Sequence, residues 1–230
     1  TKYYYQVSAV DSAGNESAST NQVSITLGDK QSQSLAGLHS VGTNVSINGT
    51  IYMISSQGTK RPYTSAGAFL SYGFNSFKTV VTASEADTAL PEGSFIPPQD
   101  GKLICSDRGT DKGTCYVITG SKKSGFTGKN VFEWFGFSFK NTTTGDVSWM
   151  DSTSNLNEQS ELHPNGVLVN NNGTIQMMSE QGLLGFPSQE IFASWGYSLA
   201  QVVKANAADK TKTQVGVVKT RTTGELSPAI

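Results

Sequence analysis

The stretch Gly49-Thr50-Ile51-Tyr52-Met53-Ile54, which leads to Ala68-Phe69-Leu70-Ser71-Tyr72-Gly73-Phe74, occurs three times in this chain. It returns between Gly113 and Phe137, and again between Gly173 and Tyr197. From the first glycine of each copy, a single aromatic residue follows after 14, 13 and 13 positions. A phenylalanine follows after 20, 19 and 19 positions, and a second glycine after 24, 23 and 23. Agreement at this many offsets predicts a structural repeat.

Each copy is predicted to fold as a β-hairpin followed by a short helix. Asn48-Gly49 and Asn172-Gly173 stand between apolar runs, which is typical of a type I′ hairpin turn. A polar turn, the single aromatic residue and a helix of about two turns come next. The helix is expected to end at Gly73, Gly136 or Gly196, where glycine adopts a left-handed conformation at little cost.

The aromatic residues of the three predicted helices form one face, which predicts core packing rather than a stripe that stacks on sugars. Tyr52 and Trp134 fall outside that face and are the better candidates for an exposed role. A helix this short is not stable alone, so it must lie on its hairpin and on neighbouring copies. The predicted core residues of the repeats are Phe69, Tyr72, Phe132, Phe135, Phe192 and Trp195.

The fold class that follows is a β-rich α+β protein with tandem ββα units. We divide the chain into copy one (42–99), copy two (100–162), copy three (163–214) and a C-terminal strand and tail (215–230). The Ser/Thr/Asn-rich segment 144–162 is expected to be a long surface connector that carries Trp149 and Met150. Residues 28–41 are expected to form a polar linker before the first copy.

The composition argues against nucleic-acid and membrane partners. The 230 residues carry a net charge of −1 with only 15% charged residues, so no basic field exists to attract an anionic polymer or lipid surface. No apolar run approaches the about 20 residues that span a bilayer. The chain starts at Thr1 with neither a signal peptide nor an initiator methionine, so we expect a processed chain or part of a longer one.

The two cysteines, Cys105 and Cys115, flank a polar stretch at the place where the other copies have a tight turn. We favour a cross-strand disulfide over a metal pair, because two thiols with no nearby histidine make a poor zinc site. A disulfide implies an oxidising compartment, and abundant Ser, Thr, Asn and Gly are typical of secreted surface proteins.

The first 27 residues predict two alternating strands around a turn at Asp11–Asn15. The pattern Tyr3-x-Tyr5-x-Val7-x-Ala9-x-Asp11-x-x-Gly14-Asn15-x-Ser17 strongly resembles the last two strands of a fibronectin type III domain. Two strands of a sandwich are not independently stable. The resemblance therefore implies that the other strands lie upstream in a longer chain or come from another molecule.

The repeat resembles repeats of large secreted surface proteins of bacteria, notably of candidate-phylum lineages, which often stand beside fibronectin type III domains. The residues that carry this resemblance are Tyr52-Met53-Ile54, Lys60-Arg61-Pro62-Tyr63 and Phe69–Phe74. Copy two keeps a basic pair before Phe126, whereas copy three has Leu183-Leu184 there. That difference weakens the idea of a repeated basic ligand site. The resemblance brings no catalytic residues with it.

Signatures of catalysis or metal binding are absent from the sequence. No dinucleotide, phosphate-loop, nucleophile-elbow, zinc-protease or EF-hand motif occurs. A triad through His163 with Glu161 or Asp151, and carboxylate pairs at Glu85/Asp87 and Glu158/Glu161, are interpreted as solvated residues of linkers. Calcium has candidate carboxylate ligands in Asp107 and Asp111, and in Asp87 and Asp209, but we assign no metal and no cofactor.

These observations predict a non-enzymatic structural segment of an extracellular, cell-surface or secreted protein, part of a surface layer, fibre or stalk. Its partners would be further copies or other surface proteins. Two alternatives stay open. One is a module that binds cell-wall polysaccharide through the exposed aromatics Tyr52, Trp134 and Trp149, as an adhesin would. The other is an accessory region of a secreted hydrolase.

Overall fold

The computed structural model describes residues 2–5, 8–17, 23–26, 37–74, 76–157 and 162–228. The chain forms two compact units, Thr1–Leu38 and His39–Ile230. The boundary falls inside the predicted linker 28–41, so His39–Val41 belong to the second unit. With 18% helix and 28% strand, the protein is a sheet-rich α+β protein. None of the helices in the described ranges is long and apolar enough to cross a membrane.

The first unit contains the two predicted strands. Strand β1 (Lys2–Tyr5) pairs antiparallel with β2 (Val23–Thr26), with Tyr3 opposite Ile25. Between them, the Asp11 carboxylate accepts the backbone N–H groups of Ala13 and Asn15 and closes the predicted turn. Hydrogen bonds from Asn15 hold the pKa of Asp11 below its usual value. The fibronectin type III resemblance stays a prediction.

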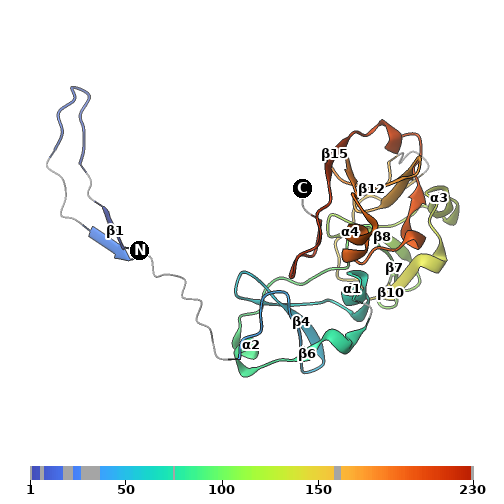
Figure 1. Ribbon diagram of the computed structural model, residues 1–230, viewed down its shortest axis with the longest axis horizontal. Coiled ribbons are helices and arrows are strands. Elements are labelled where there is room, and N and C mark those ends of the chain that lie inside the picture. The colour runs from blue at the N-terminus through green and yellow to red at the C-terminus, as the bar shows by residue number, and fades with distance from the viewer. Residues whose placement is uncertain are drawn as a thin grey trace. The chain divides into compact units, whose positions relative to one another are not determined.

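Copy one forms a four-stranded sheet in the order β5-β4-β3-β6 (Figure 1). The hairpin joins β3 (Asn44–Ile47) and β4 (Thr50–Ile54) through Asn48 and Gly49, both at positive φ. The other elements are β5 (Lys60–Pro62), α1 (Ala66–Ser71), the 3-10 turn η1 (Phe77–Thr79), β6 (Val81–Thr82) and α2 (Glu85–Ala89).

Copy two has the same order, β10-β7-β8-β9, with the edge strand again parallel to the first strand of the hairpin. Helix α3 starts after its N-cap residue Gly128. The elements are β7 (Leu103–Ser106), β8 (Cys115–Thr119), β9 (Lys122–Ser124), α3 (Lys129–Trp134), η2 (Phe139–Asn141) and β10 (Thr142–Gly145).

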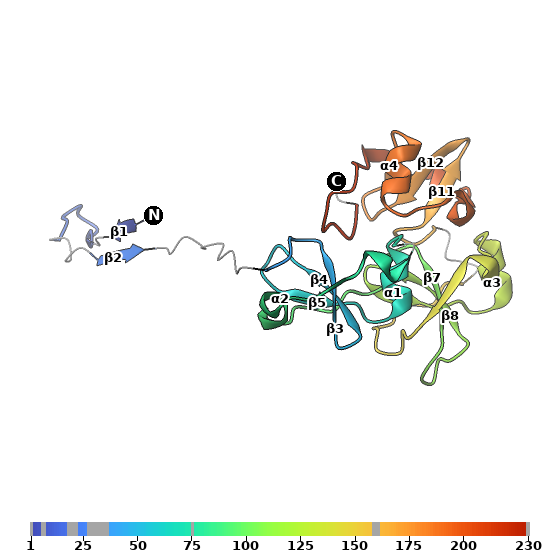
Figure 2. The same ribbon diagram turned by 60° about the horizontal axis from the view of Figure 1, so that its bottom comes forward.

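Copy three adds a fifth strand, in the order β14-β11-β12-β13-β15. Its elements are β11 (Leu168–Asn171), β12 (Thr174–Met178), β13 (Leu183–Gly185), α4 (Gln189–Ser194), η3 (Leu199–Gln201), β14 (Val203–Lys204), η4 (Asp209–Thr211) and β15 (Gln214–Val217). Strand β15, the predicted C-terminal strand, pairs parallel with β13. The three sheets are seen as blue-to-teal, green-to-yellow and orange-to-red blocks in Figure 2.

The predicted polar turn follows each hairpin, and after it comes a third strand that was not predicted. Lys60 and Lys123 occupy the same position in β5 and β9, opposite Ile54 and Ile118. Each lysine donates to backbone carbonyls of the segment that follows the sheet: Lys60 Nζ to Thr88 and Leu90, both at 2.6 Å, and Lys123 Nζ to Val147 at 2.8 Å. Copy three has Leu183 here, and Leu183 packs in the core instead.

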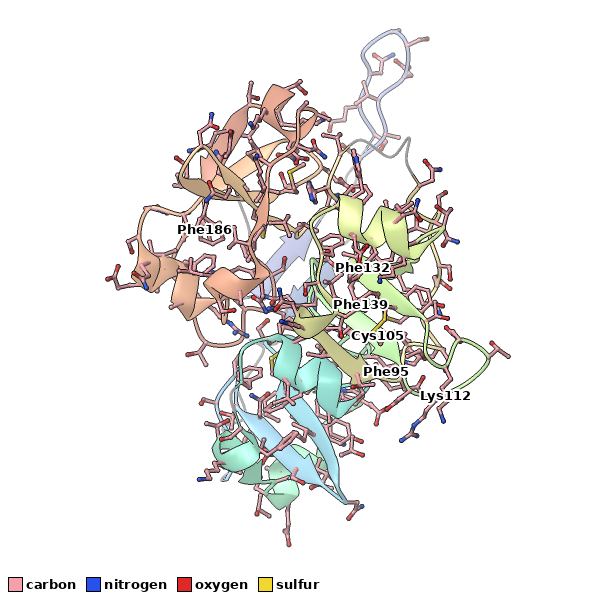
Figure 3. The ribbon with its side chains drawn as sticks, turned by 90° about the vertical axis from the view of Figure 1, so that its right-hand side faces the viewer. Phe95, Cys105, Lys112, Phe132, Phe139 and Phe186 are labelled. Atoms are coloured by element: carbon pink, nitrogen blue, oxygen red, sulfur yellow. A yellow bond between two sulfur atoms is a disulfide. The ribbon has the colours of Figure 1, made fainter. Side chains whose placement is uncertain are left out.

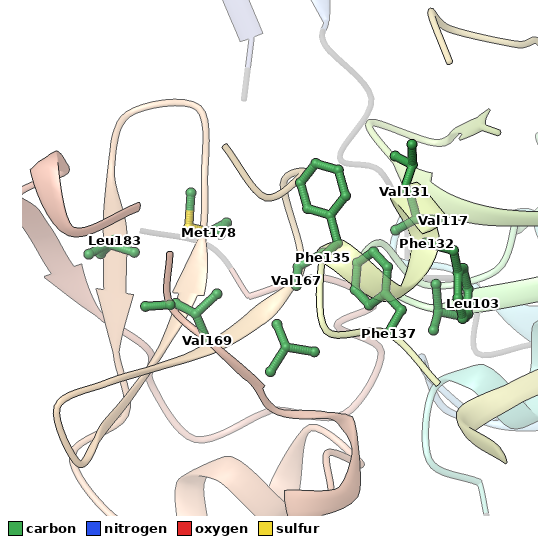
Figure 4. Close-up of a cluster of buried hydrophobic side chains, with 12 residues drawn as sticks. Leu103, Val117, Val131, Phe132, Phe135, Phe137, Val167, Val169, Met178 and Leu183 are labelled. Carbon is green, nitrogen blue, oxygen red and sulfur yellow. The ribbon is translucent and has the colours of Figure 1, made fainter. Parts of the chain in front are cut away.

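The helix aromatics lie in the core, where Phe69, Phe132, Phe135, Phe192, Tyr72 and Trp195 are all buried. In each copy the single aromatic meets the helix phenylalanine edge to face, at 5.2 Å for Tyr63–Phe69, 5.1 Å for Phe126–Phe132 and 5.2 Å for Phe186–Phe192. The largest buried cluster joins copies two and three, with Phe135 and Phe137 beside Val167 and Val169 (Figure 4).

The copies approach one another so closely at certain glycines that a side chain would not fit. A Cβ at Gly73 would lie 2.2 Å from Gly196 Cα, and one at Gly101 would lie 2.0 Å from the Gly166 carbonyl oxygen. Helix α1 packs on β10 of copy two in the same way, since a Cβ at Gly67 would lie 2.7 Å from the Thr144 carbonyl oxygen. The second unit is thus one packed body of three copies.

Arg221, which follows the last strand, holds copies one and three together. Its guanidinium lies 5.1 Å from the Phe74 ring centre and 5.7 Å from that of Trp195. It donates a 2.8 Å hydrogen bond to the Tyr72 carbonyl oxygen. A flat cation between aromatic rings is a favourable contact, and it closes the seam between these two copies.

Candidate functional site

The only two histidines of the chain each pair with a buried aspartate. Asp87 and Asp209 accept the backbone N–H and the ring Nδ1 of His39 and His163 at 3.0 and 2.6 Å in both cases. The histidine lies six residues before the paired position of the first hairpin strand, and the aspartate lies in the short helix or 3-10 turn after the edge strand. The sequence interpretation of His163 and Asp87 as solvated linker residues is wrong, because both are buried and hydrogen-bonded.

The aspartates are held ionised by their hydrogen bonds. Burial raises the pKa of Asp209, but the bonds from His163 and from the Asn206 N–H outweigh burial and lower it below its usual value. Asp87 shows the same balance between burial and bonds from His39 and Ser84, and its pKa is also lowered. Ser84 and Asp87 form a reciprocal capping box at the start of α2.

His163 has acceptors at both ring nitrogens. Its Nε2 lies 2.8 Å from the carbonyl oxygen of Phe135 in copy two, and its Nδ1 faces Asp209. A carbonyl oxygen only accepts, so the contact with Phe135 is a hydrogen bond that Nε2 donates. Through its two ring nitrogens, His163 joins Asp209 of copy three to the backbone of copy two.

Copy two lacks this pair. Strand register places Pro98 where the other copies have histidine, six positions before Ile104, and Trp149 where they have aspartate. Copy two instead has an ion pair between Lys123 and Asp111 at 2.5 Å, both mostly buried, with the Tyr116 hydroxyl 3.2 Å from Asp111. The bond from Lys123 lowers the pKa of Asp111.

These arrangements do not assemble a catalytic centre within the described ranges. His163 is paired with Asp209 and not with Asp151, and its Nε2 is occupied by a backbone carbonyl. The Ser84 hydroxyl bonds to Asp87, not to His39. Glu85 is exposed, and Glu158 and Glu161 lie outside the described residues.

The disulfide is present between Cys105 and Cys115, which face each other across β7 and β8. It closes the loop that carries Asp107 and Asp111, the candidate calcium ligands. Asp111 is engaged with Lys123, and Asp107 lies near Arg108 at 3.8 Å. Across the described residues no three His, Cys, Asp or Glu side chains gather as a metal would require.

The three glycan candidates have different neighbours and different exposure. Trp134 is 52% exposed and packs edge-on against Phe135, whereas Tyr52 is only partly exposed and reaches Glu92 at 3.5 Å. Trp149 is 44% exposed and lies 6.3 Å from Phe95, which is 58% exposed. Sequence reasoning missed Phe95, whose partner across the copy boundary only the fold reveals (Figure 3). Met150, expected on the surface beside Trp149, is buried.

A hollow of about 260 Å³ lies where copies two and three meet, lined by Asp100, Tyr197 and the turn Ser179–Gln181. Gln99 borders it, and its buried amide has no hydrogen-bond partner among the described residues. Burial raises the pKa of Asp100, although the N–H groups of Ser121 and Gly120 oppose this. The nearby Lys102 lies over the Tyr197 ring at 5.1 Å, and burial lowers the pKa of Lys102 to about 8.

Comparison with protein-family models, with characterised proteins and with solved structures gave no significant match to this chain.

Proposed function

We propose that this chain is a non-enzymatic structural segment of an extracellular surface protein, in which tandem ββα copies form a spacer or a building block of a layer, fibre or stalk. One observation carries the proposal. The groups that would be candidates for chemistry, His39, His163, Asp87 and Asp209, are paired with one another by hydrogen bonds in copies one and three.

Further support comes from the way the copies are joined. The backbones of different copies approach closely at Gly73–Gly196 and Gly101–Gly166, so the copies pack directly on one another. The disulfide Cys105–Cys115 supports an oxidising environment. The resemblances to a fibronectin type III ending and to bacterial surface repeats agree with this setting. In this proposal the partners are further copies of the chain or other surface proteins, and no cofactor is needed.

The test is the mass and assembly state of the native molecule, by intact mass spectrometry and electron microscopy of cell-surface material. We expect a larger chain arranged in a lattice or filament. A catalytic domain in the same native chain would support the accessory region of a hydrolase instead. A freely diffusing species of about 24.5 kDa, the mass of this chain, would contradict the structural proposal.

Polysaccharide binding is the second candidate, and the exposed pair Phe95–Trp149 favours it. Two neighbouring, partly exposed rings at the junction of copies one and two offer an apolar surface of the kind that binding sites use. Pull-down by purified wall polysaccharide should be lost in Trp149→Ala if this pair is the contact. Unchanged pull-down in that variant would remove the pair from consideration.

A further inference from the structure

Copies one and three have an open hollow at the same place in the fold. The hollow of copy one measures about 610 Å³ and lies between the hairpin β3–β4, the start of α1 and the turn η1. That of copy three measures about 560 Å³ and lies between β11–β12, η3 and the edge strand β14. Copies one and three, which differ in sequence, thus form a hollow at the same place on the surface.

Four positions of the wall are equivalent by strand register. Ser46 faces Ile51 across the first hairpin, and Asn170 faces Ile175 across the third. The other two equivalent positions are the first residue of the 3-10 turn and the residue just before the edge strand. They are occupied by Phe77 and Val80 in copy one, and by Leu199 and Val202 in copy three.

In the equivalent 3-10 turns η1, η2 and η3, the first residue has a large apolar side chain that is exposed. Phe77 is 48% exposed, Phe139 49% and Leu199 62%. Phe77 stacks on Phe69 at 5.3 Å, and Phe139 stacks on Phe132 at 4.3 Å, so each ring has one covered and one open face. An apolar side chain held open in every copy is a candidate contact for a ligand.

Copy two differs at the wall. Cys105 and Cys115 stand where Ser46–Ile51 and Asn170–Ile175 stand, so a disulfide replaces the polar side chain of the wall. A disulfide donates no hydrogen bond. Copy two therefore keeps the exposed ring of Phe139 but loses the polar group beside it, which makes it an internal control.

The lining indicates the chemistry of the ligand. Hydroxyl groups of Ser46, Thr50, Thr64 and Ser65 border the first hollow, with Phe77 on one side and no charged side chain. In the third hollow, Lys204 and Lys210 join the amides of Asn170 and Asn172. No acidic side chain is among the residues lining either hollow. Hydroxyl and amide groups beside an apolar platform suit a ligand with hydroxyl edges and an apolar face.

We propose that these equivalent hollows are carbohydrate sites, the first for neutral sugar rings and the third for rings that carry a carboxylate. The proposal deepens the second candidate function, because it moves glycan contact from the aromatic pair to a place that the fold repeats. Lysines suit the third site since their ammonium groups attract an anionic ring without demanding one geometry.

The test uses the whole chain, a glycan array with neutral and uronic-acid glycans, and calorimetry with a neutral β-glucan oligosaccharide and an oligogalacturonate. We expect Phe77→Ala to weaken glucan binding about tenfold, as the loss of one ring contact would. The matched control Phe139→Ala removes the equivalent ring and should leave binding unchanged. Lys204→Ala with Lys210→Ala should remove oligogalacturonate binding and its salt dependence.

A second variant, Ser46→Leu, replaces a hydroxyl group of the first hollow by a larger apolar side chain and leaves Phe69 and Phe77 in place, and should also weaken glucan binding. Equal losses in Phe77→Ala and Phe139→Ala would overturn the proposal, because the effect would then come from the core. Loss of glycan binding only in Trp149→Ala would overturn the proposal that the hollows bind glycans and would place the binding at the pair Phe95–Trp149. Absence of binding to every glycan would overturn both and leave the structural role.

Discussion

Copies one and three close on themselves by a histidine–aspartate pair, whereas copy two closes without one. In copy two the equivalent positions are Pro98 and Trp149, and this copy alone has the disulfide and the buried ion pair of Lys123 with Asp111. All three nevertheless form the same hairpin, third strand, helix and parallel edge strand. The backbone arrangement thus forms with or without the histidine–aspartate pair.

The difference between the copies is tested most strongly by removing one aspartate of the histidine–aspartate pairs at a time. Asp209→Ala removes the partner of the buried backbone N–H and ring Nδ1 of His163, and a buried polar group left without its partner costs about 1–3 kcal/mol. Asp87→Ala should cost less, because the side chain of His39 is 34% exposed and water can replace the aspartate. Urea unfolding measures both free energies. Equal losses in the two variants would show that burial of the histidine does not determine how much stability the pair contributes.

The disulfide of copy two is the next test of the comparison. Replacing Cys105 and Cys115 by serine should lower the free energy of unfolding by roughly 2–3 kcal/mol, because a closed loop of about 10 residues no longer restricts the unfolded chain. Dithiothreitol should reproduce this loss in the native protein and have no effect on the serine variant. A native protein whose stability is insensitive to reduction would show that the disulfide contributes little to the folding of this copy.

Gly67→Ala tests the contact by which α1 packs on copy two. The added Cβ would lie 2.7 Å from the Thr144 carbonyl oxygen, and such overpacking costs about 1–3 kcal/mol. The equivalent position of α4 is the exposed Glu190, so Glu190→Ala is the matched control and should change stability by less than about 0.5 kcal/mol. A neutral effect of Gly67→Ala in thermal unfolding would show that α1 and β10 do not pack this tightly in solution.

The sequence predicted the local structure of each copy well, because its signals act over a few residues. Asn48-Gly49 and Asn172-Gly173 specify their turns, and the helix aromatics are buried in all three copies. The third strand was missed because Lys60–Pro62 and Lys122–Ser124 are short and polar, and only their pairing to the hairpin makes them strands.

The candidate site was harder to predict, since its members are distant in sequence. His39 and Asp87 are 48 positions apart and His163 and Asp209 are 46 apart, so each residue alone is typical of a linker. The spacing is nevertheless similar in the two copies, and that agreement was a usable signal. The hollows had no such signal, because their walls combine residues from the hairpin, the 3-10 turn and the edge strand.

The smallest expected effect concerns Lys102, which has Thr43 and Val167 as its neutral counterparts in copies one and three. Burial lowers the pKa of Lys102 to about 8, whereas an unfolded lysine has a pKa of about 10.4. Between these values the unfolded chain binds more protons than the folded one, so the stability of the protein should rise as pH increases from about 8 to about 10. Each unit of the pKa difference corresponds to about 1.4 kcal/mol, and partial exposure of the ammonium reduces the gain to an order of 1 kcal/mol.

Urea unfolding at several pH values measures this slope, and Lys102→Met should flatten it because the neutral side chain makes copy two like the other copies at this position. A slope that persists in Lys102→Met would assign the effect to another group, and the difference between the copies would then lie outside this junction.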